Sequence, residues 1–81
     1  MNNTQASPTP VLHNIDVLVA SAEEASFGVA EFWSGDRLLG VTCLEDGELT
    51  LRIGPSTDDV VLGAQALTKA LAEADRLLAL Y

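Results

Sequence analysis

Residues Ser56–Tyr81 read STDDVVLGAQALTKALAEADRLLALY, and this stretch decides most of the expected fold. Its apolar residues recur at spacings that alternate between four and three, which is the period of a helix with one continuous apolar face. Ser56 can cap the N-terminus of this helix, and Asp59 follows three residues later, as in a capping box. The pattern predicts a helix over Thr57–Leu80, with an apolar face formed by Val60, Ala64, Leu67, Leu71, Ala74, Leu78 and Tyr81.

The residues before this helix have the pattern of strands. Phe27–Trp33, Arg37–Leu44 and Glu48–Ile53 are rich in apolar and β-branched residues, and glycine-containing turns at residues 34–36 and 45–47 separate them. Asn14–Ala20 is interpreted as a fourth strand, with a short helix as the alternative, and the polar residues 21–26 as a turn. The sequence therefore predicts an α+β fold: an antiparallel meander of three or four strands, followed by one long C-terminal amphipathic helix packed on the sheet.

Length and composition indicate a single small domain. The chain has 81 residues, of which 48% are hydrophobic, and we expect residues 1–10, with two prolines, to form a disordered arm before one domain over residues 11–81. A core of this size gives little net stability, and the single cysteine, Cys43, excludes an internal disulfide. Oligomerisation is the remaining way to add stability, so we expect a homodimer.

The net charge of −8 constrains the possible partners. Four scattered basic residues cannot neutralise a phosphate backbone, so direct nucleic-acid binding is not expected. A basic protein partner fits this charge, although acidity can also serve solubility alone. No apolar run is long enough to span a membrane, and no basic region precedes an apolar run at the N-terminus, so we expect a cytoplasmic protein without membrane contact.

Two features predict apolar surface that the domain does not cover by itself. A helix of about 23 residues is roughly 34 Å long, whereas strands of six to eight residues span roughly 20 to 26 Å, so about two helical turns overhang the sheet. The strands also carry apolar residues on both faces, which indicates that a partner covers the second face. The overhang holds Leu77, Leu78, Leu80 and Tyr81, and the second face of Arg37–Leu44 carries Leu38 and Leu44. Phe32 and Trp33 lie on opposite sides of Phe27–Trp33, and Trp33 fits either an interface anchor or the core.

No residue pattern indicates catalysis. His13, the only histidine, has no reactive neighbour in the sequence, and Cys43, on the apolar face of Leu39 and Val41, is interpreted as a buried, unreactive thiol. The glycines form no phosphate-binding loop, and no serine lies in a nucleophile elbow. We therefore predict no enzymatic activity, no cofactor and no metal site.

The leading hypothesis is a non-enzymatic protein-interaction module, a small acidic regulator or inhibitor of the antitoxin, immunity or regulatory-subunit type that acts as a homodimer. The alternatives are a small-ligand-binding or enzymatic domain with a pocket between sheet and helix, and an acidic mimic of nucleic acid that blocks a DNA-binding protein. The acidic turn at residues 45–48 is either a solvated turn or a contact for a basic partner. The predicted partner-binding residues are Phe32, Trp33, Leu38, Glu45, Asp46, Glu48, Leu77, Leu78 and Tyr81.

Overall fold

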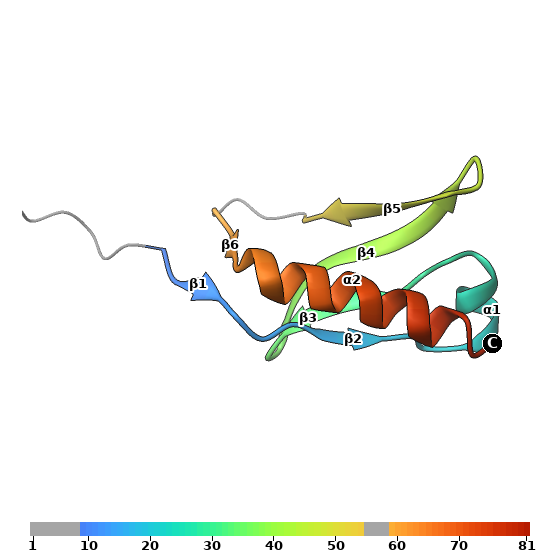
Figure 1. Ribbon diagram of the computed structural model, residues 1–81, viewed down its shortest axis with the longest axis horizontal. Helices are drawn as coiled ribbons and strands as arrows, with labels where there is room; N and C mark the ends of the chain where they lie inside the picture. The colour runs from blue at the N-terminus through green and yellow to red at the C-terminus, as the bar shows by residue number, and fades with distance from the viewer. Residues whose placement is uncertain (1–8, 55–58) are drawn as a thin grey trace, which may run out of the picture.

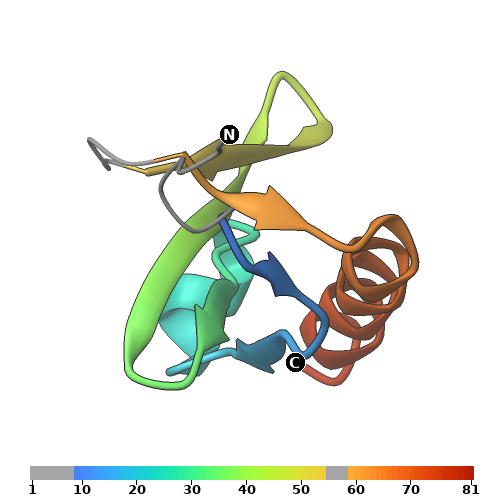
Figure 2. The same cartoon turned by 90° about the vertical axis from the view of Figure 1, so that its left-hand side faces the viewer.

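The computed structural model describes residues 9–54 and 59–81. Its main sheet is antiparallel, and a C-terminal helix, α2, packs on it, so the predicted α+β fold is confirmed (Figure 1). Figure 2 shows the sheet curving from β5 round to β2, with α2 lying across the open side. The strand order is β2-β3-β4-β5, formed by β2 (Asp16–Leu18), β3 (Glu31–Ser34), β4 (Arg37–Glu45) and β5 (Glu48–Ile53), and α2 spans Ala64–Leu78.

The segment between the first two strands of this sheet differs from the expected turn. Residues Ala22–Ser26 form a short helix, α1, because the Ser21 hydroxyl accepts a hydrogen bond of 3.1 Å from the Glu24 amide. A serine with a glutamate three residues later is a sequence signal for the start of a helix, and Ser21 and Glu24 have this spacing. Of the two alternatives for Asn14–Ala20, a strand or a short helix, the structure has the strand. Only the residues Asp16–Leu18 belong to it, and they pair with β3.

The long helix begins later than predicted. Val61–Leu62 form a short strand, β6, that pairs in parallel with β1 (Val11–Leu12), and Gly63, with extended dihedral angles, is the N-cap of α2. The apolar, partly β-branched run before Gly63 favours a strand once a partner is available. The prediction of a helix across these residues was therefore wrong, whereas the predicted Ser56 cap lies outside the described residues.

The side of α2 that faces the sheet is turned slightly from the predicted one. Ala70 and Ala74 are buried, while Leu71, predicted on the apolar face, is 38% exposed. Small side chains let a helix approach a sheet closely, so the two alanines define the contact, and the larger side chains flank it. Leu67, Leu77 and Leu78 pack against the core as partly buried neighbours.

The overhang of two helical turns is not present. The helix has 15 residues, which corresponds to roughly 22 Å at 1.5 Å per residue and is shorter than the nine-residue β4. The helix starts seven residues later than predicted and ends at Leu78, and both Leu77 and Leu78 pack against the core. Only the residues after the helix, including Leu80 and Tyr81, project with exposures of 69% and 61%.

A bulge between β3 and β4 changes which side chains of β4 are buried. Phe32 is paired with Gly40 and Trp33 with Leu38, so Leu39 is the extra residue. The alternation then shifts by one residue, and Thr42 is buried where the sequence pattern predicted Val41 and Cys43. Cys43 is half-buried instead, and the prediction that it is a core thiol was wrong.

Candidate functional site

An apolar groove of about 320 Å³ lies at one end of the molecule. It is bounded by α1, the β4–β5 hairpin and the C-terminal end of α2, three elements that Figure 1 shows at the same end. These elements are far apart in the sequence, so the groove exists only in the folded chain. Its lining residues are Ala25, Gly28, Leu44, Leu49, Asp75, Leu78 and Ala79.

Gly28 is needed for one wall of the groove. Its φ is +73°, in the left-handed region that side chains disfavour, and a Cβ atom there would lie 2.6 Å from Leu44 Cγ. The preceding residue is held in place because the Leu44 amide donates a 2.9 Å hydrogen bond to the Phe27 carbonyl. The backbone of this segment therefore runs directly beside Leu44, and both line the groove.

The same backbone segment is anchored by a buried hydroxyl. Thr42 Oγ1 accepts a 2.9 Å hydrogen bond from the Ala30 amide and donates a 2.7 Å hydrogen bond to the Gly28 carbonyl. Thr42 is fully buried, so neither backbone group has water as an alternative partner. The position of the groove wall consequently depends on a side chain of the core.

Large apolar side chains at this end of the molecule remain exposed. Phe27, which immediately precedes Gly28, is 62% exposed, and Leu44 is 46% exposed. Leu78 lines the groove from α2, and Leu80 and Tyr81 continue beyond that helix. A groove with exposed aromatic and leucine side chains is typical of a surface that binds another protein.

Acidic side chains surround this apolar surface. Glu45, Asp46 and Glu48 are exposed on the hairpin between Leu44 and Leu49, and Asp75 belongs to the lining itself. Asp46 and Gly47 both have positive φ, at 53° and 81°, as a two-residue hairpin turn requires, which confirms the turn predicted there. One of these acids is paired, since Arg52 Nη2 lies 3.2 Å from a Glu45 carboxylate oxygen.

The structure thus brings five of the predicted partner-binding residues to one end of the molecule. Leu78 lines the groove, and the acidic hairpin turn lies beside it. Leu77 is half-buried against the core and offers less free surface than predicted. Leu44 and Leu49 also line the groove and were not predicted as contact residues, because the helix that brings Leu78 next to them is remote in sequence. The five residues are Glu45, Asp46, Glu48, Leu78 and Tyr81.

The remaining predicted partner-binding residues lie in β3 and β4. Phe32 is only 2% exposed and belongs to the core, so its prediction as a contact residue was wrong, because it faces α2 rather than solvent. Trp33 and Leu38 are paired neighbours on the opposite face of the sheet. The Trp33 indole nitrogen donates a 2.9 Å hydrogen bond to Glu31 Oε1, and Leu38 is 41% exposed.

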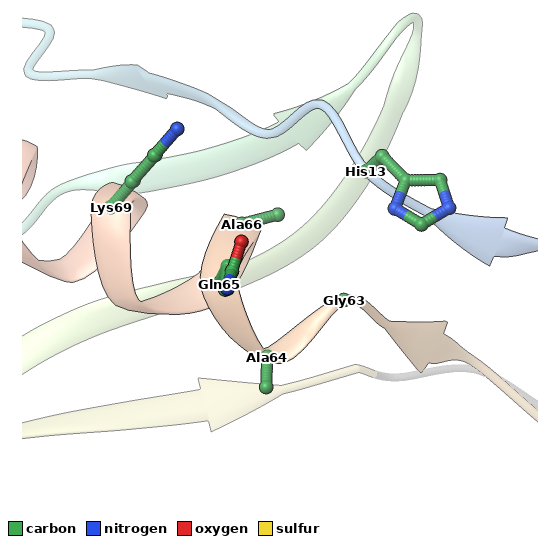
Figure 3. Close-up of a pocket in the computed structure, with 6 residues that line it drawn as sticks. All are labelled: His13, Gly63, Ala64, Gln65, Ala66 and Lys69. Atoms are coloured by element: carbon green, nitrogen blue, oxygen red, sulfur yellow. The ribbon is translucent and has the colours of Figure 1, made fainter.

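Another pocket lies at the N-terminus of α2 (Figure 3). It is lined by His13, Gly63, Lys69 and the first helical residues, with a volume of about 440 Å³. Figure 3 shows the His13 ring and the Lys69 amine at opposite ends of this pocket. These two side chains therefore do not converge on a common point, and Gln65 also lines the pocket between them.

Within residues 9–54 and 59–81, no three side chains of histidine, cysteine, aspartate or glutamate are grouped so that they could hold a metal ion. On α2, the hydrogen bond from Arg76 lowers the pKa of Glu73 and raises the pKa of Arg76 in turn. The two side chains of that pair are 60% and 43% exposed, and they lie on the helix surface rather than in either pocket.

Comparisons with known proteins give no relative: no protein-family model, no curated protein and no solved structure matches the chain. Among the described residues, no helix is long and apolar enough to cross a membrane. The functional interpretation therefore depends on the surface of this chain alone.

Proposed function

We propose that the protein is a non-enzymatic interaction module, a small acidic regulator or inhibitor that forms a homodimer and binds another protein. The observation that carries the proposal is the apolar groove at the end of the molecule, with exposed Leu44 in its lining and acidic side chains around it. Exposed Phe27 immediately precedes Gly28, which also lines the groove. A domain this small gains nothing in stability from exposing these side chains, so a binding role accounts for them better than a structural one.

The chemistry of the groove favours a basic partner segment with a large apolar side chain. A volume of about 320 Å³ is at the small end of binding pockets, which suits one or two side chains rather than a whole cofactor. The carboxylates of Glu45, Asp46, Glu48 and Asp75 favour lysine or arginine around that anchor. An apolar anchor in a pocket with a polar rim is the arrangement that supplies most of the affinity in protein interfaces.

The experiment is an affinity capture from cell extract with three forms of the protein. Leu44→Asp places a charge in the lining of the groove, and Leu18→Asp makes the same change at a leucine of β2 that is 51% exposed and is not part of that lining. We expect the wild type and Leu18→Asp to capture the same protein, and Leu44→Asp to bind it at least tenfold more weakly. Circular dichroism confirms that both variants are folded.

The salt dependence of binding to the captured protein tests the charge component. Exposed charges are screened at high ionic strength, so the affinity should fall between 50 mM and 500 mM salt, and the reversal Asp46→Lys should lower it further. Capture of the same protein by all three forms, or of none by any form, would refute the groove as the binding site.

A further inference from the structure

Strand β5 leaves one edge of the sheet open. The strand order places β5 last, next to β4 only, and no other strand of the described residues pairs with its outer edge (Figure 1). The opposite edge strand, β2, has three residues, whereas β5 has six. An open strand of this length is a template for pairing with a further strand.

The hydrogen-bonding pattern shows which groups of β5 are free to bond. Gly40 and Ile53 are directly opposite each other in the ladder. Their neighbours are joined, because the Gly54 amide donates a 3.0 Å hydrogen bond to the Leu39 carbonyl. This geometry identifies Gly40–Ile53 as a non-hydrogen-bonded pair of the antiparallel ladder, and the pairs then alternate along the strand. The backbone groups of Leu49, Leu51 and Ile53 consequently point away from β4, toward the open edge.

The sequence of β5 is complementary to itself when it is reversed. The residues Glu48-Leu49-Thr50-Leu51-Arg52 place a glutamate and an arginine at equal distances from Thr50, with a leucine on either side. In a two-fold antiparallel pair centred on Thr50, Glu48 of one copy lies opposite Arg52 of the other, twice over. Leu49 lies opposite Leu51, and the two threonines meet at the axis.

This register also agrees with the backbone groups that are free. Leu49 and Leu51 of the two copies form the hydrogen-bonded pairs, and Glu48 and Arg52 form non-hydrogen-bonded pairs, in which side chains approach more closely. Arg52 is available for such a contact because its side chain is 82% exposed, even while it lies near Glu45.

Other registers lose this complementarity. A slip of one residue places core-facing side chains opposite outward-facing ones. A slip of two residues toward Ile53 removes both ion pairs. A slip of two toward the turn leaves Arg52 opposite Asp46, which lies in the turn before the strand with a φ of 53°. A slip of four toward Ile53 places Arg52 opposite Arg52. A charged edge that only prevented aggregation would not need opposite charges spaced to match each other.

We propose that the protein dimerises through β5, by two-fold antiparallel pairing centred on Thr50, so that the two sheets become one continuous sheet. This inference rests on the self-association in the proposed function and identifies the surface that carries it. The partner is a second copy of this chain, and the contact is isologous. Both α2 helices then lie on the same face of the joined sheet. Leu49 takes part in the pairing while its side chain lines the groove, so dimerisation fixes one wall of the partner-binding site.

The charge pairs give a test by reversal and rescue. Glu48→Arg places arginine opposite arginine twice, and Arg52→Glu places glutamate opposite glutamate twice, so each single variant should weaken the dimer at least tenfold. The double variant Glu48→Arg/Arg52→Glu restores both pairs with reversed polarity and should recover the wild-type dimer. Glu23→Arg, an exposed acid on α1, is the control for net charge.

The measurement is the molar mass in solution by light scattering across a range of concentrations, with circular dichroism to confirm folding. Recovery in the double variant separates pairing from misfolding, because a merely structural role for either residue would not be rescued by a second reversal. A dimer that persists in both single variants would overturn pairing through β5 and leave the proposed function intact. A wild type that stays monomeric would overturn this inference and the self-association in the proposed function, whereas the groove would still be tested separately by Leu44→Asp.

A cross-link checks the register directly. At a non-hydrogen-bonded pair the two Cα atoms are about 4.5 Å apart, which is within the range of a disulfide. Thr50→Cys should therefore form a disulfide-linked dimer under oxidising conditions. The background must be Cys43→Ser, because Cys43 is the partner of Thr50 in the same chain. A slip of two residues would hold the two cysteines too far apart, so absence of the cross-link in a dimeric sample would refute this register.

Discussion

Replacement of Thr42 by valine tests the account of how the core holds the groove wall. Thr42 is fully buried, and its hydroxyl accepts from the Ala30 amide and donates to the Gly28 carbonyl at 2.9 and 2.7 Å. Valine has nearly the same shape, so it fills the same space and removes both hydrogen bonds. The two backbone groups then remain buried without partners.

The expected cost follows from these two groups. Leaving a buried donor or acceptor unsatisfied costs about 1–3 kcal/mol, and the additional methyl group of valine offsets part of this. The net loss for Thr42→Val should be about 2–4 kcal/mol. Thr42→Ser keeps the hydroxyl and loses one methyl group, which should cost only about 1 kcal/mol. At roughly 0.05–0.15 kcal/mol per residue, the whole domain has about 4–12 kcal/mol, so the valine variant should lose much of it.

Urea denaturation followed by circular dichroism measures the difference, with every variant at the same protomer concentration because dimerisation contributes to apparent stability. Thr42→Val should unfold at a clearly lower urea concentration than Thr42→Ser. If the valine variant were as stable as the serine variant or more so, the two hydrogen bonds would not matter for the fold, and the argument that Thr42 fixes the groove wall would be refuted.

Two further substitutions test other parts of the structure. Ala70→Asp buries a charge against the sheet and should unfold the domain. Leu71→Asp changes a position that is 38% exposed and should leave the circular dichroism spectrum near that of the wild type. Equal loss of structure in both variants would contradict the observed orientation of α2. Glu73→Gln removes the exposed pair with Arg76, which lowers the pKa of Glu73. A carboxyl group with a lowered pKa stabilises the fold above its unfolded pKa and loses that contribution as the pH falls through its folded value. The small difference between wild type and Glu73→Gln, measured as the thermal midpoint at pH 7 and then in acid, should therefore disappear at low pH.

Local signals in the sequence predicted several elements well. The Asp46-Gly47 pair predicted a tight hairpin turn, and the alternation of Glu48–Ile53 predicted a strand with the bounds that are observed. The period of three and four predicted the C-terminal helix, although not its first residue. Each of these signals depends on the conformational preferences of neighbouring residues, which act before any distant contact is formed.

The candidate site was only partly predictable. The acidic hairpin and Leu78 were identified from composition and periodicity, but nothing in the sequence indicated that Leu78 would meet Leu44 and Gly28. Phe32 and Trp33 were not distinguished, because both are aromatic neighbours in one strand, and the face that α2 covers decides which of them is buried.

The sequence by itself determined the α+β class, the two hairpins of the meander and the helical period of its last third, because these follow from local backbone preferences and from the alternation of apolar residues. Only the tertiary structure decided that Val61–Leu62 pair with Val11–Leu12 rather than extend the helix, and that a bulge at Leu39 brings Thr42 into the core. It also decided that the groove joins three separate segments. These outcomes depend on contacts between residues far apart in the chain, whose free energy outweighs the weaker local preferences once the segments are packed together.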